Sequence, residues 1–481
     1  MDPTASASWR DGHDVVAEGP RWPAMVMILL AAVLSAVAIW LHYPGHISMD
    51  SSMQVIEAST GRSETWNPPH TSALLRWFGP GPAGVGRLMA FNAICTYLAL
   101  ALSAVAAFRA GPLRSPRSIV MRAAAAILVI ANPVIGIYVG IVWKDVVFAT
   151  FLAAGVAAGL MSCVAARRPA IAWAVASALL LAFAMRVRQQ GIFMAPVLLV
   201  LPMLGAASLR GLSRSRAAAA ALSIVLAFGA GLVVFDAAVA RTIHQDDRFG
   251  SQVGFNGLMQ YDIAGMVARS QTPSDRLPIA MNDELRAQVR SVYSADRGDF
   301  LWYSPAVTQW LSLPGYGGVR KMWWAMVRAE PKAYAAHRLA VFRSILDVDG
   351  VKACLPVHVG IDGDNARLSR LGFVPGLDRY DQSIYDASRG LVYWPIFRHF
   401  AYAIALVLVT LLILFSPMHA RLKRGTVPVA IGTALLYASY LPTSIACDFR
   451  YLYPAVCLVS MLWLVWLGAA RGRPAFGRRR P

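Results

Sequence analysis

The chain has 481 residues, of which 57% are hydrophobic and only 15% charged, and its mean hydropathy is +0.51. Soluble domains carry about one quarter charged residues, so this composition excludes an ordinary soluble protein and indicates a membrane protein. The formal net charge is +19. Most of this charge lies in short loops between apolar stretches, which favours membrane lipids as its partners and argues against nucleic acid.

Apolar stretches recur along the whole chain. A transmembrane helix needs about 20 apolar residues. Ten stretches of roughly that length contain few or no charges, and they predict spans near 24–41, 88–108, 119–138, 146–166, 169–185, 191–207, 217–235, 399–417, 427–446 and 451–470. The first stretch lacks a small-x-small cleavage site, so we interpret it as a retained anchor and not as a signal peptide. The sequence therefore predicts an all-α polytopic membrane protein with about ten transmembrane helices.

The distribution of Lys and Arg predicts the orientation of these helices. With the N-terminus in the cytoplasm, 19 of the 45 basic residues fall in the cytoplasmic segments, as the positive-inside rule requires. The tail 1–23 and the Arg-rich tail 471–481 are then cytoplasmic. This arrangement suits a multi-pass protein of the bacterial plasma (inner) membrane.

Two long segments fall on the extracytoplasmic side. Residues 42–87 form a first outer loop within the first seven predicted helices (24–236), and residues 237–398 form an insert of mixed structure before the last three (399–470). The stretch from Pro331 has helical periodicity with interleaved Arg, which is typical either of a helix on a membrane surface or of one packed within its own domain. Cys354 and Cys447 both fall in this compartment, where they can form a disulfide.

Unusual polar residues collect on the same outer side. The outer ends of the predicted spans contain Asp50, His70, Lys144, Asp145, Arg186, Arg188, Gln189, Asp448 and Arg450. Short outer turns are expected to contain few cations, so these cations indicate a function. Guanidinium binds phosphate bidentately and Lys binds it as a point charge, so cations beside carboxylates at a bilayer surface suit a lipid-linked phosphate.

Each of these residues also has a structural interpretation. Asp50 precedes a helical-looking run and could be a helix N-cap. Lys144 and Asp145 could form structural ion pairs with each other or with the cations of neighbouring turns, and Asp448 could pair with Arg450. Arg186 and Arg188 could extend to lipid headgroups. The sequence leaves both interpretations open.

The order of these motifs resembles the GT-C superfamily of integral-membrane glycosyltransferases. The resemblance lies in Asp50 after the first span, the Asn67-Pro68-Pro69-His70 element, the Trp143-Lys144-Asp145 turn, the Arg188 region and the stretch from Asp448 to Tyr453. Two departures stand out: Ser51 follows Asp50 where many relatives have a second acid, and 237–398 is inserted where many relatives have a C-terminal domain.

The resemblance implies a function and roles for these residues. The enzyme would transfer a sugar from a polyprenyl-phosphate donor to a glycan or glycolipid acceptor. Asp50 would be the catalytic carboxylate, Lys144, Arg188 and Arg450 would stabilise the phosphate, and Arg186 would bind substrate. His70, Asp145, Gln189 and Asp448 would orient the substrate or the catalytic groups. A divalent cation (Mg, Mn or Ca) is a possible cofactor. The alternatives are a transporter or flippase of lipid-linked saccharides and a glycan polymerase or ligase that uses lipid pyrophosphates.

Overall fold

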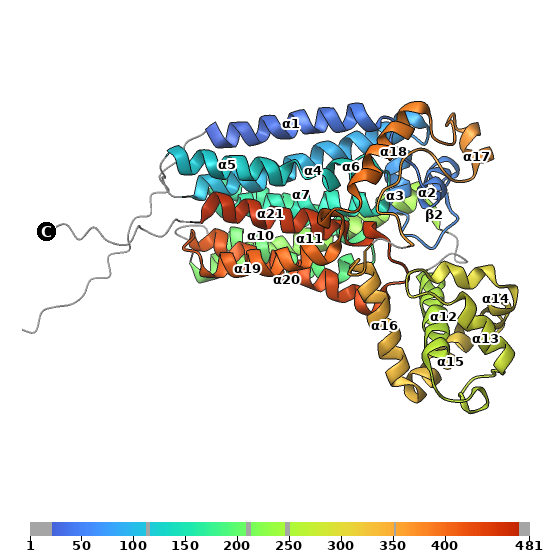
Figure 1. The fold of residues 1–481 in the computed structure, drawn as a ribbon. Coiled ribbons are helices and arrows are strands. Elements are labelled where there is room, and N and C mark those ends of the chain that lie inside the picture. The colour runs from blue at the N-terminus through green and yellow to red at the C-terminus, as the bar shows by residue number, and fades with distance from the viewer. Residues whose placement is uncertain (1–21, 112–115, 208–212, 246–250, 351–352, 471–481) are drawn as a thin grey trace, which may run out of the picture.

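The computed structural model describes residues 22–111, 116–207, 213–245, 251–350 and 353–470. The predicted cytoplasmic tails therefore lie outside the described residues, apart from Trp22 and Pro23. The fold is a long helical bundle with a smaller group of helices that projects from one end (Figure 1). We call this end the insert end.

Twelve of the described helices build the bundle. They are α1 (Trp22–His42), α4 (Pro82–Ala110), α5 (Pro116–Ile130), α6 (Pro133–Tyr138), α7 (Lys144–Val164), α8 (Arg167–Val187), α9 (Gly191–Leu198), α10 (Val200–Ala207), α11 (Arg214–Thr242), α19 (His399–Phe415), α20 (Ala420–Thr443) and α21 (Tyr453–Ala469). Among the described residues, seven helical stretches are long and apolar enough to cross a membrane, and two more, 191–207 and 399–415, are apolar but shorter. Helix α20 occupies the place of the remaining predicted span, so all ten predicted stretches are helical.

Proline residues divide two of the predicted spans. Pro202 has no N–H to donate to the Leu198 carbonyl, and the helix over 191–207 is broken at Leu199 into α9 and α10. Similarly, α6 starts afresh at Pro133, where the Asn132 side chain accepts a hydrogen bond from the Val134 N–H at 3.0 Å. Helices α7 and α21 lie at the centre of the bundle, whereas α1 and α11 lie at its surface.

The first outer loop is mostly structured. It contains α2 (Met49–Thr60), the two-residue strand β1 (Arg62–Ser63) and α3 (His70–Phe78). Strand β1 pairs in parallel with β2 (His244–Gln245), which follows α11. This pairing fixes the first outer loop against the start of the insert, at the insert end of the bundle.

The insert divides into two parts and is more helical than predicted. Its first part has a hydrophobic core of its own and contains α12 (Ser251–Arg269), η2 (Ser274–Arg276), α13 (Asp283–Val292), η3 (Gly298–Tyr303), α14 (Pro305–Ser312), α15 (Gly315–Ala329) and α16 (Pro331–Ile345). Its second part returns to the bundle and contains α17 (Asn365–Arg370), α18 (Arg379–Leu391) and η4 (Pro395–Phe397). Val357, Leu368 and Val392 of this second part belong to the core of the bundle.

The structure adds three details to the predicted insert. Helix α11 continues to Thr242, past residue 237, where the insert was predicted to begin. The described part of the insert contains only one strand, β2, because its apolar residues recur at helical spacing. The stripe from Pro331 is α16, whose buried residues Ala333 and Val341 pack in the core of the insert's first part.

Candidate active site

Asp50 lies in the first turn of α2, at the insert end. The N-cap of this helix is Ser48, so Asp50 is not the cap that its sequence context allowed. Half of its side chain, 51%, is exposed. The Arg450 guanidinium approaches the Asp50 carboxylate to 2.5 Å. Burial of the carboxyl opposes ionisation, but the positive charges of Arg450, Lys144 and Arg188 together hold the pKa of Asp50 below its ordinary value.

A buried ion network lies behind Asp50. Asp145, in the first turn of α7, is 0% exposed and forms an ion pair with Arg188. Arg450 contacts three carboxylates: besides Asp50 it lies 2.9 Å from Asp448 and 3.9 Å from Asp145. Asp145 thus contacts the guanidinium groups of both Arg188 and Arg450, which come from distant parts of the chain, and holds them in one site.

Aromatic rings and one amide complete the walls. The Arg188 guanidinium lies 4.8 Å from the ring centre of Tyr451, and that of Arg450 lies 5.1 Å from the ring centre of Trp143. The Lys144 ammonium donates a hydrogen bond to the Asn67 side-chain oxygen and lies 5.0 Å from the centre of the Trp66 ring. Cation–π contacts of this kind fix the direction of a cation without neutralising it.

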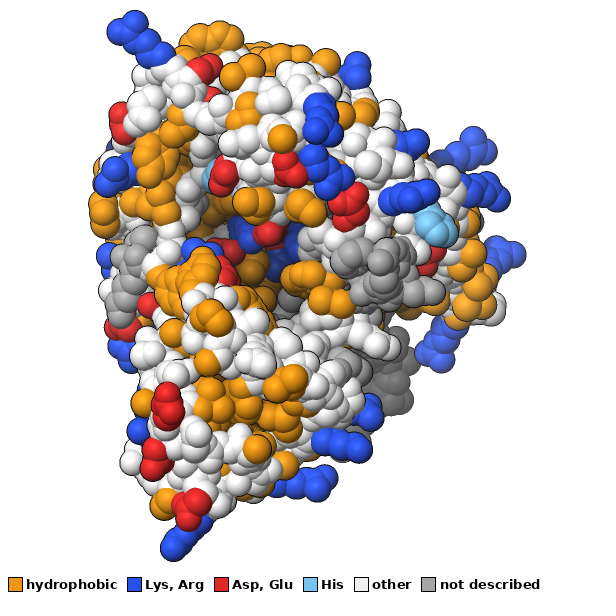
Figure 2. Space-filling model, turned by 90° about the vertical axis from the view of Figure 1, so that its right-hand side faces the viewer, with side chains coloured by type: hydrophobic (Ala, Val, Ile, Leu, Met, Phe, Trp, Pro, Cys, Tyr) orange, Lys and Arg blue, Asp and Glu red, His pale blue; other side chains and the backbone are white. Residues whose placement is uncertain are grey.

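These residues surround a pocket of about 300 Å³ that opens at the insert end. Figure 2 views this face and shows a hollow with basic and acidic side chains at its floor. The pocket is lined by Asp50, Met53, Glu64, Thr65, Trp66, Asn67, Lys144, Arg188, Val253, Arg450 and Tyr451. Three cations therefore converge on a solvent-accessible space that also contains an ionised carboxylate.

Six of the predicted site residues meet here: Asp50, Lys144, Asp145, Arg188, Asp448 and Arg450. Four of them line the pocket, and Asp145 and Asp448 contact its arginines. Their ion pairs also match the structural interpretation of Asp145 and of the pair Asp448–Arg450. Arg188 is buried, so it does not extend to lipid headgroups.

The structure places the other three predicted residues outside this pocket. His70 and Arg186 both contact Asp236 of α11, at 3.2 Å and 2.6 Å. Burial lowers the pKa of His70 to about 4 despite the neighbouring Asp236 carboxylate. Gln189 is exposed, and it is Gln190 that accepts a hydrogen bond from Arg188, at 2.9 Å. A turn of consecutive polar residues gives no sequence signal for which side chain points inward.

The backbone stretch that carries Asp448 and Arg450 is attached to the insert. Arg338 of α16 donates a hydrogen bond to the Ser444 carbonyl at 2.7 Å, and the Gly298 N–H donates to the Ile445 carbonyl at 2.9 Å. The Cys447 side chain forms a disulfide with Cys354, as the sequence allowed. The insert therefore supports one wall of the pocket.

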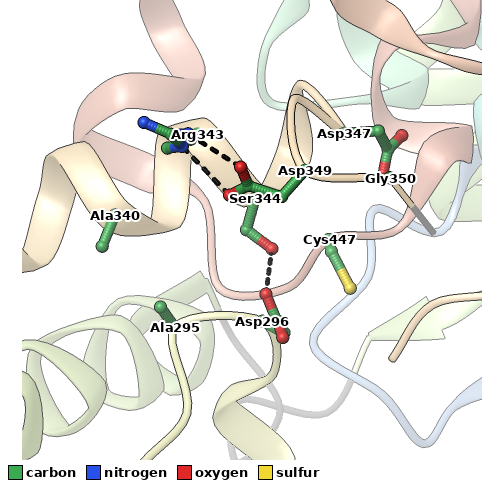
Figure 3. Close-up of a pocket in the computed structure, with 9 residues that line it drawn as sticks. All are labelled: Ala295, Asp296, Ala340, Arg343, Ser344, Asp347, Asp349, Gly350 and Cys447. Carbon is green, nitrogen blue, oxygen red and sulfur yellow. Dashed lines mark hydrogen bonds and ion pairs between the residues drawn. The ribbon is translucent and has the colours of Figure 1, made fainter. Parts of the chain in front are cut away.

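A second cavity, of about 260 Å³, lies at the junction of the insert and the bundle (Figure 3). Most of its charged groups already have partners: Arg343 contacts Asp349 at 2.7 Å, and Ser344 donates to Asp296 at 2.5 Å. Burial raises the pKa of Asp347 to about 8, opposed by the charge of Arg398 and aided by Asp296. The described residues contain no group of three or more His, Cys, Asp or Glu side chains placed to hold a metal ion, in this cavity or elsewhere.

Fold and site together define a polytopic α-helical membrane protein with a cation-lined pocket at one end of its bundle. Neither a protein-family model nor a curated protein matches the sequence. Among solved structures, the chain is similar to the crystal structure of ArnT from Cupriavidus metallidurans in the apo state. This match has 14% identity and a TM-score of 0.29, over 93% of this chain and 77% of that one. ArnT bound to undecaprenyl phosphate gives 16% identity and a TM-score of 0.32, with the same coverage.

A third similar structure is the archaeal oligosaccharyltransferase AglB from Archaeoglobus fulgidus, in complex with an inhibitory peptide and a dolichol-phosphate. Its identity is 12% and its TM-score 0.38, over 92% of this chain but only 50% of AglB. Identities and TM-scores this low describe a coarse likeness of fold, which leaves the pocket as the basis for a function.

Proposed function

We propose that this chain is a membrane glycosyltransferase that moves a sugar from a polyprenyl-phosphate carrier to an envelope glycan or lipid on the extracytoplasmic face. The observation that carries the proposal is the pocket in which ionised Asp50 lies beside Lys144, Arg188 and Arg450. The distribution of basic residues along the sequence supports the extracytoplasmic placement of this pocket.

The chemistry follows from the charges. An acceptor hydroxyl attacks the anomeric carbon of the donor and gives its proton to the Asp50 carboxylate. The bond between that carbon and the phosphate oxygen breaks, and its electron pair leaves with the phosphate. Lys144, Arg188 and Arg450 stabilise the negative charge that develops there. No strong acid is required, because phosphate is a good leaving group.

The ion pair between Asp50 and Arg450 fits this mechanism. A carboxylate whose pKa is lowered by a guanidinium is ionised but is a weak base. A donor phosphate that binds Arg450 competes with Asp50 for the same N–H groups. Donor binding therefore releases the carboxylate and makes it a stronger base when the acceptor arrives.

The rival functions have different requirements. A flippase needs polar groups along a path through the membrane, whereas the buried helix α7 has charged residues only at its pocket end, Lys144 and Asp145. A polymerase or ligase would use the same cations on a lipid pyrophosphate. The products therefore distinguish a ligase from the proposed transferase.

The test compares the envelope glycolipids of cells with and without the gene by mass spectrometry. Restoring the wild-type gene should restore one sugar on one glycolipid or glycan, and Asp50→Asn at equal membrane abundance should not. Asp364→Asn is the matched control, because Asp364 caps α17 outside the pocket and Asn caps a helix about as well as Asp. Restoration by Asp50→Asn would refute the role of the carboxylate, and an unchanged set of glycolipids without the gene would refute the proposed function.

A further inference from the structure

A second carboxylate on α2 is entirely buried. Glu57 lies two helical turns after Asp50, and its side chain is 0% exposed. A buried carboxylate is costly unless several hydrogen bonds replace its water. Glu57 is not among the residues that line the pocket. Its role must therefore be inferred from the groups to which it is hydrogen-bonded.

The hydrogen bonds of Glu57 reach one short loop and the helix α3 that follows it. Its Oε1 accepts from the N–H groups of Glu64 and Thr65 and from the Thr65 hydroxyl, each at 2.8 Å. Its Oε2 accepts from the Ser72 hydroxyl at 2.6 Å. Charge-assisted bonds of this kind are stronger than neutral ones, so one carboxylate fixes the backbone between β1 and α3.

This loop supplies a wall of the pocket. Its next two residues are Trp66 and Asn67, and Asn67 accepts the hydrogen bond from Lys144. The Trp66 ring packs on Gly254 of α12, where a Cβ atom would lie only 2.7 Å from ring atom Cε3. The position of the Lys144 ammonium thus depends on a loop whose backbone is hydrogen-bonded to Glu57.

We propose that Glu57 is a positioning residue: it holds the loop 63–67 so that Asn67 and Trp66 aim the Lys144 ammonium into the pocket. This inference rests on the proposed function for its link to donor binding. Glu57 does not itself touch the substrate.

Two substitutions separate the hydrogen bonds of Glu57 from its charge. In Glu57→Gln the amide oxygen still accepts from both backbone N–H groups, and the amide NH₂ donates to Ser72, whose hydroxyl can turn to accept. In Glu57→Leu all of these bonds are lost. The released loop should then expose the bond after Arg62 to trypsin in the purified full-length protein. We expect faster cleavage there in Glu57→Leu than in wild type, and no change in Glu57→Gln.

Binding of undecaprenyl phosphate to the same proteins tests the link to Lys144. We expect Glu57→Leu to weaken binding about tenfold, whereas Glu57→Gln stays within about threefold, because the loop keeps its place. In an Asn67→Ala background Glu57→Leu should weaken binding less than about twofold further, since the connecting contact is already absent. A merely structural role would instead give losses that add.

The outcomes distinguish this inference from the proposed function. Equal trypsin cleavage in wild type and Glu57→Leu, or additive losses with Asn67→Ala, would overturn the positioning role. If wild type binds no undecaprenyl phosphate while cleavage follows the expected order, the loop assignment stands and the proposed donor is wrong. If Glu57→Leu does not accumulate in membranes, Thr65→Val removes one loop donor and should raise the cleavage rate, and an unchanged rate would overturn the inference.

Discussion

At Arg450 a single guanidinium meets the carboxylates of Asp50, Asp448 and Asp145. Such a planar fork binds two oxygens at once, and Lys cannot reproduce it. We therefore expect Arg450→Lys and Arg188→Lys to weaken donor binding by about 1–3 kcal/mol, or roughly 5- to 150-fold, for each charge-assisted bond lost. Donor-saturation curves on the purified variants would measure this loss.

Arg343→Lys is the matched control for these variants. Arg343 forms a bidentate pair with Asp349 outside the pocket, so this exchange should leave the donor curve unchanged. If both pocket variants behaved like the control, their arginines would be structural.

Asp347 provides a prediction for pH. Its pKa is raised to about 8, so the folded protein keeps a proton that the unfolded chain loses near pH 4. The stability that this proton contributes is complete below about pH 4 and is lost as the pH rises through about 8. At pH 9 the free energy of unfolding of Asp347→Asn should therefore exceed that of wild type by a few kcal/mol, and its melting temperature should be higher.

The difference in melting temperature should stay level above about pH 8 and narrow as the pH falls from about 8 to 5. Asn also tolerates the left-handed backbone at this position, where φ is 53°. Asp275→Asn, at an exposed position, should track wild type throughout. A constant gap between Asp347→Asn and wild type across this range would contradict the assignment.

The part of the site that follows from membrane topology could be predicted from the sequence. Lys144, Arg188 and Arg450 were singled out because cations in short outer turns are unusual, and the structure brings them together. The prediction named Gln189, whereas Gln190 contacts Arg188, because the sequence of one irregular turn gives no signal for which side chain points inward. Glu57 gave no signal because a lone acid in a helical run resembles a solvated one.

At the scale of the elements, the disulfide joins the second part of the insert to the stretch before α21. Cys354 and Cys447 are 93 residues apart, and cross-linking a loop of this length contributes about 2–5 kcal/mol. A variant with Ser at both positions should unfold at a lower temperature than oxidised wild type. It should also lose activity, because Cys447 adjoins Asp448.

Reductant separates this effect from a general defect of the double variant. Adding it should lower the melting temperature of wild type to that of the variant, and should leave the variant unchanged. A wild-type protein insensitive to reductant would show that the bond contributes nothing to stability.

The positions of the helices could be predicted from the lengths of the apolar stretches, but not every break within them could. The ten predicted stretches are helical because about 20 apolar residues favour a helix wherever the backbone must satisfy its own hydrogen bonds. The break at Leu199 was not predicted, although its cause, Pro202, is visible in the sequence. The two parts of the insert could not be separated, because the contact of Val357 and Leu368 with the bundle depends on tertiary packing.

For the whole molecule, orientation is the central prediction. Reporters active only after export should be active when fused after Asp236 and inactive after Arg168 and Arg214, because this orientation puts 19 basic residues in the cytoplasm. The reverse pattern would place the pocket on the cytoplasmic side and would contradict the proposed function.

The insert is hydrogen-bonded to the backbone carbonyls of Ser444 and Ile445, only a few residues before Arg450. Its first part projects from the end of the bundle (Figure 1). An antibody fragment that recognises this projecting part, and shifts it by even a small amount, would displace the arginine without entering the pocket. With the orientation and the donor proposed above, such a fragment would inhibit from outside the cell without competing with the lipid substrate.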